Sequence, residues 1–252
     1  MKKILIIGIG AGNPDYITMQ AVKALNQVDV FFILDKGPAK EKLTRLRKDI
    51  CEQYITDPNY RVVEATLPER DRHQPDYDQA VGDLNDAKQA LFAQLIRDEV
   101  AEDQCGAFLV WGDPSLYDST IRILDGILAA DGPVFEYDVI PGITSVQALT
   151  ARHKVPLNQI GRAVEITTGR RLLRGMPEGV DSVVVMLDNN NAWRQLPDAD
   201  LSIYWGAYIG TPDEILISGK LAEVGEEIER VRTAAREANG WIMDTYLLRR
   251  ES

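Results

Sequence analysis

The sequence predicts a bilobal α/β protein with a parallel α/β N-terminal domain over residues 1–140 and a mixed-sheet α/β C-terminal domain over residues 141–252. Before Pro141-Gly142, short apolar runs alternate with amphipathic helical stretches, which is typical of a parallel sheet. After this pair the expected strands follow one another with few helices between them, which favours a mixed sheet with hairpin links. A chain of 252 residues is long enough for two modest domains.

Continuous apolar runs of the first half predict strands that are buried on both faces. Such runs occur at residues 4–7, 30–34 and 108–111, and two further strands are expected at residues 61–67 and 134–140. Apolar residues at helical spacing predict helices at residues 40–53, 77–103 and 119–129, and a further helix that begins near Thr18. Threonine is a favoured N-cap residue, so Thr18 is expected to cap that helix.

The second half begins with an expected helix at residues 143–153, whose first turn contains Thr144 and Ser145. Strands are then expected at residues 163–168, 182–187, 201–205, 215–218 and 241–248, with a late helix at 223–237. The sequence contains no internal repeat and no low-complexity segment.

Composition excludes several classes of function. The net charge of −11 argues against nucleic-acid binding, which needs a basic face. Cys51 and Cys105 are too few for a disulfide framework, which favours the cytoplasm. His73 and His153 have no partners at metal-ligand spacing, so no metal is expected. No apolar run approaches the roughly 20 residues of a membrane span, and no signal peptide is indicated.

The first expected strand is followed by a glycine-rich loop, Gly8-Ile9-Gly10-Ala11-Gly12-Asn13-Pro14-Asp15. Such a loop suggests a dinucleotide fingerprint, in which Asp35 would bind the ribose. The spacing disagrees, because Asn13 stands where the third glycine belongs and Pro14 interrupts the turn before a helix begins. An NAD-dependent dehydrogenase therefore remains only as an alternative of a different class.

Similar turns of glycine or small residues follow other expected strands. They occur at Gly112-Asp113, at Pro141-Gly142-Ile143-Thr144-Ser145 and at Gly206-Ala207. Turns of this kind at the carboxyl ends of strands present backbone N–H and C=O groups to a ligand. They suit a ligand with adenosine and amino-acid parts better than they suit a metal.

The order of these motifs resembles the tetrapyrrole methyltransferases, which use S-adenosylmethionine to methylate uroporphyrinogen and the precorrins. The matching pieces are residues 8–15 with Thr18, residues 112–114 and residues 141–145. Residues 111–120, 185–188 and 203–214 are most similar to the members that methylate C1 of precorrin-5 with loss of an acetyl group. The resemblance implies this reaction of cobalamin biosynthesis, which yields precorrin-6A and acetate. It also implies a homodimer.

The resemblance further implies a cofactor site in a cleft between the two domains. The residues implied to bind S-adenosylmethionine are Pro14, Trp111, Gly112, Asp113, Leu116, Thr144, Ser145, Met186, Gly206 and Ala207. Loss of acetate needs water and a base, and the candidates are Asp35 and Asp188, between which the sequence does not choose. Arg170, Arg171, Arg174 and Tyr117 are candidates for binding the tetrapyrrole, because arginine pairs well with carboxylates.

Other functions remain open at this point. Within the family, the chain could be another precorrin or uroporphyrinogen C-methyltransferase, because pocket shape decides which ring carbon is methylated. Outside it, a non-catalytic tetrapyrrole carrier with the same fold would show the same motifs. All these alternatives imply a small-molecule ligand, with no nucleic-acid or membrane partner.

Overall fold

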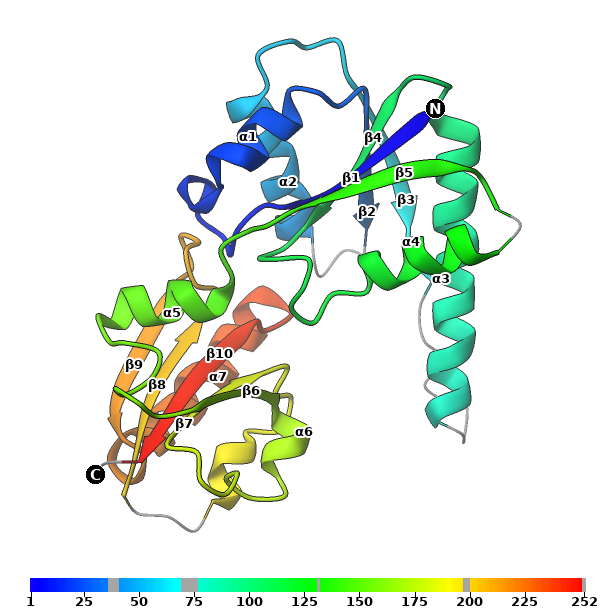
Figure 1. Cartoon of the computed structure of the whole chain (residues 1–252). Coiled ribbons are helices and arrows are strands. Elements are labelled where there is room, and N and C mark those ends of the chain that lie inside the picture. The colour runs from blue at the N-terminus through cyan, green and yellow to red at the C-terminus, as the bar shows by residue number, and fades with distance from the viewer. Residues whose placement is uncertain (36–40, 69–76, 131, 197–199, 251–252) are drawn as a thin grey trace. The chain divides into compact units, whose positions relative to one another are not determined.

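The computed structural model describes residues 1–35, 41–68, 77–130, 132–196 and 200–250 (Figure 1). The chain forms two compact units. The first contains Met1–Gly10 and Pro14–Ile143, and the second contains Ala11–Asn13 and Thr144–Ser252. The chain therefore enters the second unit briefly within the first glycine loop and again, for the rest of its length, at Thr144.

The first unit contains a five-stranded parallel sheet with the order β3-β2-β4-β1-β5. Its strands are β1 (Lys2–Gly8), β2 (Val30–Asp35), β3 (Arg61–Thr66), β4 (Cys105–Val110) and β5 (Phe135–Ile140). Its helices are the 3₁₀ helix η1 (Pro14–Tyr16), α1 (Met19–Leu25), α2 (Glu41–Tyr54), α3 (Tyr77–Glu99) and α4 (Thr120–Ala129). Strands β1 and β4 lie in the middle of the sheet, so the loops that follow them are neighbours.

Helices cover both faces of this sheet. Leu5 and Ile7 of β1 pack with residues of α1 and α2, whereas Ile4 and Ile6 pack with residues of α3 and α4. Side chains alternate between the two faces of a strand, so a strand covered on both faces must be apolar throughout. This is why the short continuous apolar runs predict the central strands.

The second unit contains a mixed sheet with the order β6-β7-β10-β8-β9. Its strands are β6 (Val164–Thr168), β7 (Ser182–Met186), β8 (Leu201–Ala207), β9 (Ile215–Lys220) and β10 (Asp244–Arg250). Strand β10 is antiparallel to β7 and β8, β8 is antiparallel to β9, and β6 is parallel to β7. A parallel sheet in one unit and a mixed sheet in the other confirm the predicted fold class.

The helices of the second unit are α5 (Ser145–His153), α6 (Gly169–Leu172), the 3₁₀ helix η3 (Ala192–Gln195) and α7 (Leu221–Asn239). Ile228 of α7 joins Trp205 and Tyr246 in the apolar core of this unit. Helix α5 contacts β8, where Leu149 lies so close to Gly206 that a Cβ there would approach it to 2.9 Å. The sheet is therefore covered by helices that come from both ends of the unit's sequence.

Several element boundaries differ from the expected ones. Helix α3 ends at Glu99 and not at residue 103. Strand β10 begins at Asp244 and not at Trp241, because Tyr208 holds the preceding segment by bonds to the carbonyl oxygens of Trp241 and Met243. The short helix α6 is not predicted, since four residues give no helical periodicity.

Candidate functional site

Three glycine loops of the first unit meet through their backbones. After β1 and β4, the N–H of Gly112 donates to the carbonyl oxygen of Gly10 at 2.8 Å, and the N–H of Gly10 donates to that of Gly112 at 3.3 Å. After β5, Gly142 lies so close that a Cβ there would overlap the Gly112 carbonyl oxygen. Gly10 and Gly112 have φ values of 81° and 68°, in the region that favours glycine.

The side chain of Asp113 fixes two of these loops. Its carboxylate accepts the backbone N–H of Gly142 at 2.8 Å and that of Ser115 at 2.8 Å, as well as the Ser115 hydroxyl. Burial raises the pKa of the Asp113 carboxyl, but the hydrogen bonds from Ser115 and Gly142 outweigh it and leave this pKa below its ordinary value. Asp113 is therefore held as an anion that orders the loops.

The first glycine loop is fixed by its own end residues. Thr18 caps α1, because its hydroxyl oxygen accepts the N–H of Ala21 at 3.0 Å, as predicted. The same hydroxyl donates to the carbonyl oxygen of Pro141 at 3.4 Å. The carbonyl oxygen of Pro14 accepts the hydroxyl of Tyr54 of α2 at 3.2 Å. These bonds tie the start of η1 and α1 to the loop after β5 and to α2.

The loop after β4 continues through the predicted residues Trp111, Leu116 and Tyr117. Trp111 and Leu116 are half-buried, whereas Tyr117 is exposed. Tyr117 has a φ of 53°, which is uncommon for a residue with a large side chain. Local strain of this kind is held by the surrounding structure and is often found at functional sites.

In the second unit, the predicted residues Thr144 and Ser145 start α5. Thr144 forms a capping box, in which its hydroxyl oxygen accepts the N–H of Val146 at 3.1 Å and Gln147 accepts the Thr144 N–H at 3.3 Å. Ser145 is bonded through its hydroxyl to the hydroxyl of Thr245 at 3.3 Å. The start of α5 is therefore attached to strand β10.

Thr245 brings the predicted residues of the second unit together. It pairs with Met186 of β7 on one side and with Gly206 of β8 on the other, so these three residues form one row across the sheet. Thr245 is buried, and sequence reasoning missed it. Ala207 follows Gly206 at the end of β8 and pairs with Asp244. Met186, Gly206 and Ser145 thus lie next to a single threonine, Thr245.

The three residues of the first glycine loop that belong to the second unit lie beside the loop after β8. A Cβ on Gly12 would overlap the carbonyl oxygen of Ile209, and the φ of Gly12 is 128°. Only glycine fits this position without strain. The last glycine of the motif, Gly12, therefore belongs to the second unit, whereas Gly8 and Gly10 belong to the first.

Asp188 lies in a buried polar network of the second unit. Its carboxylate accepts the Tyr246 hydroxyl at 2.6 Å, the Ala192 N–H at 2.7 Å and the Asn190 N–H at 3.0 Å. Gly169 leaves room for it, since a Cβ there would overlap the carboxylate. Burial, followed by the charge of Asp188, raises the pKa of Tyr246 well above its ordinary value. This arrangement anchors the loop after β7.

A second layer of the network involves Arg232 of α7. Its guanidinium donates to the Asp188 carbonyl oxygen at 2.6 Å and to the Asp244 carboxylate at 2.7 Å. Asp244 also accepts the indole N–H of Trp205 at 3.0 Å. A buried ion pair that is also hydrogen-bonded can be retained in a core, whereas removing one partner is costly.

The remaining predicted residues are less closely grouped. Asp35 ends strand β2, and its side chain lies outside the described part of the structure. Arg170 and Arg171 are exposed on α6, and Arg174 is exposed just after it. The exposed Leu187, with a φ of 54°, was not predicted, although an apolar residue at the end of a buried strand is a signal that could have found it.

Two other kinds of feature are absent from the described residues. Within the described residues, no group of three or more His, Cys, Asp or Glu side chains could hold a metal ion. None of the helices in the described ranges is long and apolar enough to cross a membrane.

Residues 3–225 match the family model of the Tetrapyrrole (Corrin/Porphyrin) Methylases. The chain belongs to this family. It is 52% identical over 250 residues to a precorrin-6A synthase [deacetylating] from Sinorhizobium sp, with 99% of this chain and 96% of the relative covered. This confirms the resemblance seen in the motifs and, with it, methyl transfer in cobalamin biosynthesis as the class of function. The dehydrogenase alternative gains no support.

Solved structures show the same fold. A cobalamin-synthesis-related protein of Corynebacterium diphtheriae is 36% identical with a TM-score of 0.86, and all of both chains is covered. A uroporphyrin-III C-methyltransferase of Thermus thermophilus, solved in complex with S-adenosylhomocysteine, is 16% identical with a TM-score of 0.61 over 98% of this chain and 96% of that one. The second likeness concerns the fold alone.

Proposed function

We propose that this tetrapyrrole methylase transfers a methyl group from S-adenosylmethionine to C1 of precorrin-5 and releases acetate, giving precorrin-6A. The observation that carries the proposal is the 52% identity, over nearly the whole of both chains, to a deacetylating precorrin-6A synthase. A second candidate is another precorrin C-methyltransferase, because a precorrin-2 C(20)-methyltransferase from Sinorhizobium sp is also similar, at 28% identity over 179 residues.

The residues of both units fit a ligand with adenosine and amino-acid parts. Gly10, Gly112 and Gly142 meet through their backbones, so the loops that follow three strands come together without side chains between them. In the second unit, Met186 and the start of α5 add an apolar side chain and capped backbone groups. We propose that these residues hold the cofactor together with Pro14, Trp111, Asp113, Leu116, Gly206 and Ala207, in a cleft between the domains.

S-adenosylmethionine would supply a methyl group that its positive sulfonium already activates. The protein's main task is then to orient the ring carbon, and orientation can contribute roughly 7–11 kcal/mol. The backbone bonds between Gly10 and Gly112 and the carboxylate of Asp113 fix the loops in advance. Fixed loops lose little entropy when the ligand binds, which favours accurate orientation.

Loss of acetate needs a base that activates water, and we propose Asp35 as the first candidate. Asp188 is the second candidate, but its carboxylate already accepts three hydrogen bonds inside the second unit. A carboxylate engaged in this way has fewer free lone pairs with which to accept a proton from water. A base typically contributes about 10²–10⁴-fold to the rate.

We further propose that Arg170, Arg171, Arg174 and Tyr117 bind carboxylates of the tetrapyrrole, and that the enzyme is a cytoplasmic homodimer without a metal. Arginine recognises a carboxylate through two parallel hydrogen bonds.

The oligomeric state is tested by the mass in solution at micromolar concentration, where a monomer would contradict the proposal. Full activity after treatment with a chelator is the expected result for the metal.

The deciding experiment is incubation with S-adenosylmethionine and precorrin-5, followed by product mass and acetate measurement. We expect one added methyl group and one acetate for each turnover. Methylation of a different precorrin or of uroporphyrinogen III, with precorrin-5 left unchanged, would favour the second candidate. Tetrapyrrole binding without binding of S-adenosylhomocysteine would indicate a carrier.

A further inference from the structure

Strands β2 and β4 separate before they reach the carboxyl edge of the first unit's sheet. They pair only from Val30↔Gly106 to Phe32↔Phe108, although β2 remains paired with β3 as far as Asp35. The carbonyl oxygen of Val110 accepts the N–H of Ile9, directly after β1, so the preceding carbonyl, that of Leu109, faces the side of β2. There it accepts the Nε–H of Arg47 from α2 at 3.2 Å. The guanidinium of Arg47 therefore lies where the pairing of β2 with β4 ends.

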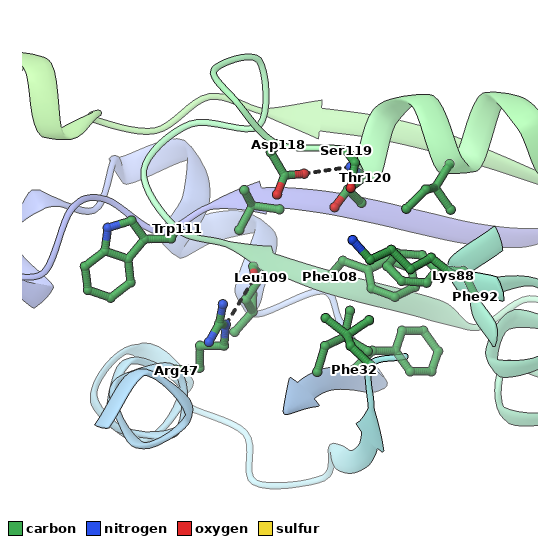
Figure 2. Close-up of a pocket in the computed structure, with 14 residues that line it drawn as sticks. Phe32, Arg47, Lys88, Phe92, Phe108, Leu109, Trp111, Asp118, Ser119 and Thr120 are labelled. Carbon is green, nitrogen blue, oxygen red and sulfur yellow. Dashed lines mark hydrogen bonds between the residues drawn. The ribbon is translucent and has the colours of Figure 1, made fainter. Parts of the chain in front are cut away.

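A pocket of about 100 Å³ occupies this gap (Figure 2). Its apolar wall is rigid, because the Phe108 ring stacks on Phe92 at 4.4 Å and on Phe32 at 4.8 Å between ring centroids. The pocket is far larger than the roughly 10–15 Å³ that one water needs by the same kind of measure. It therefore has room for several waters or for a short side chain of a ligand.

The polar side chains of the pocket make it cationic. Arg47 and Lys88 enter it from α2 and α3, and Asp118 is the acidic residue in the described part of its lining (Figure 2). Lys88 has no ion-pair partner among the residues that the structure describes. Burial lowers the pKa of Arg47, an effect that the charge of Asp118 opposes, and arginine stays protonated in proteins. Among the described residues that line the pocket, two cations and one carboxylate leave a net positive charge, in a protein whose net charge is −11.

We propose that this pocket, here called the Arg47 pocket, binds a carboxylate carried on a short aliphatic stem, namely one acidic side chain of the tetrapyrrole. The guanidinium and the ammonium would bind the carboxylate, while the phenylalanine rings would contact the stem. Trp111 lines the Arg47 pocket and immediately precedes Gly112, so the pocket adjoins the glycine loops of the first unit. This inference rests on the proposed function, since it names a contact of the same substrate.

The test compares Arg47→Gln and Lys88→Gln with Arg45→Gln. Arg45 lies on the same helix with 82% of its side chain exposed, and it is outside the pocket. We expect Arg47→Gln and Lys88→Gln each to raise the KM for precorrin-5 about tenfold or more, since a hydrogen bond to a charged group is lost. The affinity for S-adenosylhomocysteine, measured by calorimetry, should stay at the wild-type value, and Arg45→Gln should change neither quantity.

Free acetate, the proposed product, also carries a carboxylate that could bind in the Arg47 pocket. Sodium acetate is therefore added as a competing probe. If the pocket held product and not substrate, both variants would keep the wild-type KM and would lose inhibition by acetate, and this result would overturn the proposal. A raised KM in the variants without acetate supports it.

A binding measurement separates this proposal from the proposed function. Fluorescence quenching reports the affinity for uroporphyrin III, a macrocycle with acidic side chains, and needs no turnover. Weaker binding by Lys88→Gln, with wild-type affinity for S-adenosylhomocysteine, supports the Arg47 pocket even if precorrin-5 is not methylated. If Arg47→Gln fails to fold because its hydrogen bond to the Leu109 carbonyl oxygen is lost, Lys88→Gln still tests the proposal. Wild-type uroporphyrin III affinity and KM in folded Lys88→Gln would overturn the proposal.

Discussion

The carboxylate of Asp113 accepts the backbone N–H of Gly142 at 2.8 Å, and this bond joins the loop after β4 to the loop after β5. The two loops also touch at the Gly112 carbonyl oxygen, where a Cβ on Gly142 would not fit. Contact between loops leaves their relative position adjustable, whereas a charge-assisted hydrogen bond fixes it. Asp113 therefore acts on the candidate cofactor site as a positioning residue.

Substituting Asp113→Asn should weaken binding of S-adenosylhomocysteine about tenfold, because an amide has one acceptor oxygen for several donors. Calorimetry measures this affinity, and thermal unfolding should show only a modest loss of stability. Asp138→Asn is the matched control, since Asp138 of β5 forms an exposed ion pair with Lys3 at 3.0 Å. Equal affinities in both variants would mean that the Asp113–Gly142 bond does not shape the cofactor site.

The same bond predicts a pH dependence of stability. The pKa of Asp113 is lowered in the folded state from its ordinary value of 3.8, so its contribution is fully present above this value. The contribution is lost as the pH falls through the lower folded pKa. We therefore expect the difference in unfolding free energy between wild type and Asp113→Asn to shrink on acidification from about pH 6 to pH 3. A difference that grows over this range would contradict the prediction.

Gly142→Ala should destabilise the protein by about 1–3 kcal/mol, since its Cβ would overlap a backbone oxygen that cannot rotate away. Chemical denaturation measures the loss. Gly82→Ala is the control, because Gly82 lies in α3 and a Cβ there meets nothing within 4 Å. This second change should stabilise the protein by about 0.5–1 kcal/mol, the helix preference of alanine over glycine.

Tyr246→Phe should lower the unfolding free energy by about 1–3 kcal/mol, because the buried Asp188 carboxylate would lose one of its donors. Asp188→Asn should cost at least as much, since an amide nitrogen would then face a backbone N–H. Denaturant titration of both variants tests this. Wild-type stability in both would mean that Asp188 is not needed to anchor the loop after β7.

Asp35→Asn should slow acetate release by about 10²–10⁴-fold and leave the affinity for S-adenosylhomocysteine unchanged, if Asp35 is the base. A methylated product that retains its acetyl group is the expected observation in mass spectrometry. Asp188→Asn, examined at a temperature where it stays folded, is the comparison. Loss of acetate release in Asp188→Asn with normal release in Asp35→Asn would assign the base to Asp188.

The sequence predicts the central strands β1 and β4 of the first unit well because nearly all of their residues are buried, unlike those of the outer strands β3 and β5. Residues of β4 are buried at every position, so no polar alternation obscures the run. The N-cap Thr18 is also predictable, since its bond to Ala21 is local. Helix α6 is not predictable, because its four residues give no helical periodicity and the contact of Gly169 with the Asp188 carboxylate is not local in sequence.

The candidate site is predictable only where the chain itself brings residues together. The motifs around Gly112 and Thr144 can be identified from short-range patterns. Thr245 joins Met186, Gly206 and Ser145, but the nearest of these is 39 positions away, Gly206 being its partner in the sheet register. The division between Gly10 and Ala11 likewise depends on contacts of Gly12 with Ile209, which no local pattern encodes.

The assignment of Ala11–Asn13 to the second unit has a consequence for dividing the gene. A fragment that starts at Thr144 lacks the glycine that lies against Ile209, and a fragment that ends at Ile143 carries three residues without their partners. The second half alone is therefore not a complete unit. Exchange of the second half between related genes would replace Ile209, the partner of Gly12, while Gly12 itself stays. Substitutions in the first glycine loop and in the loop after β8 must therefore be compatible with one another.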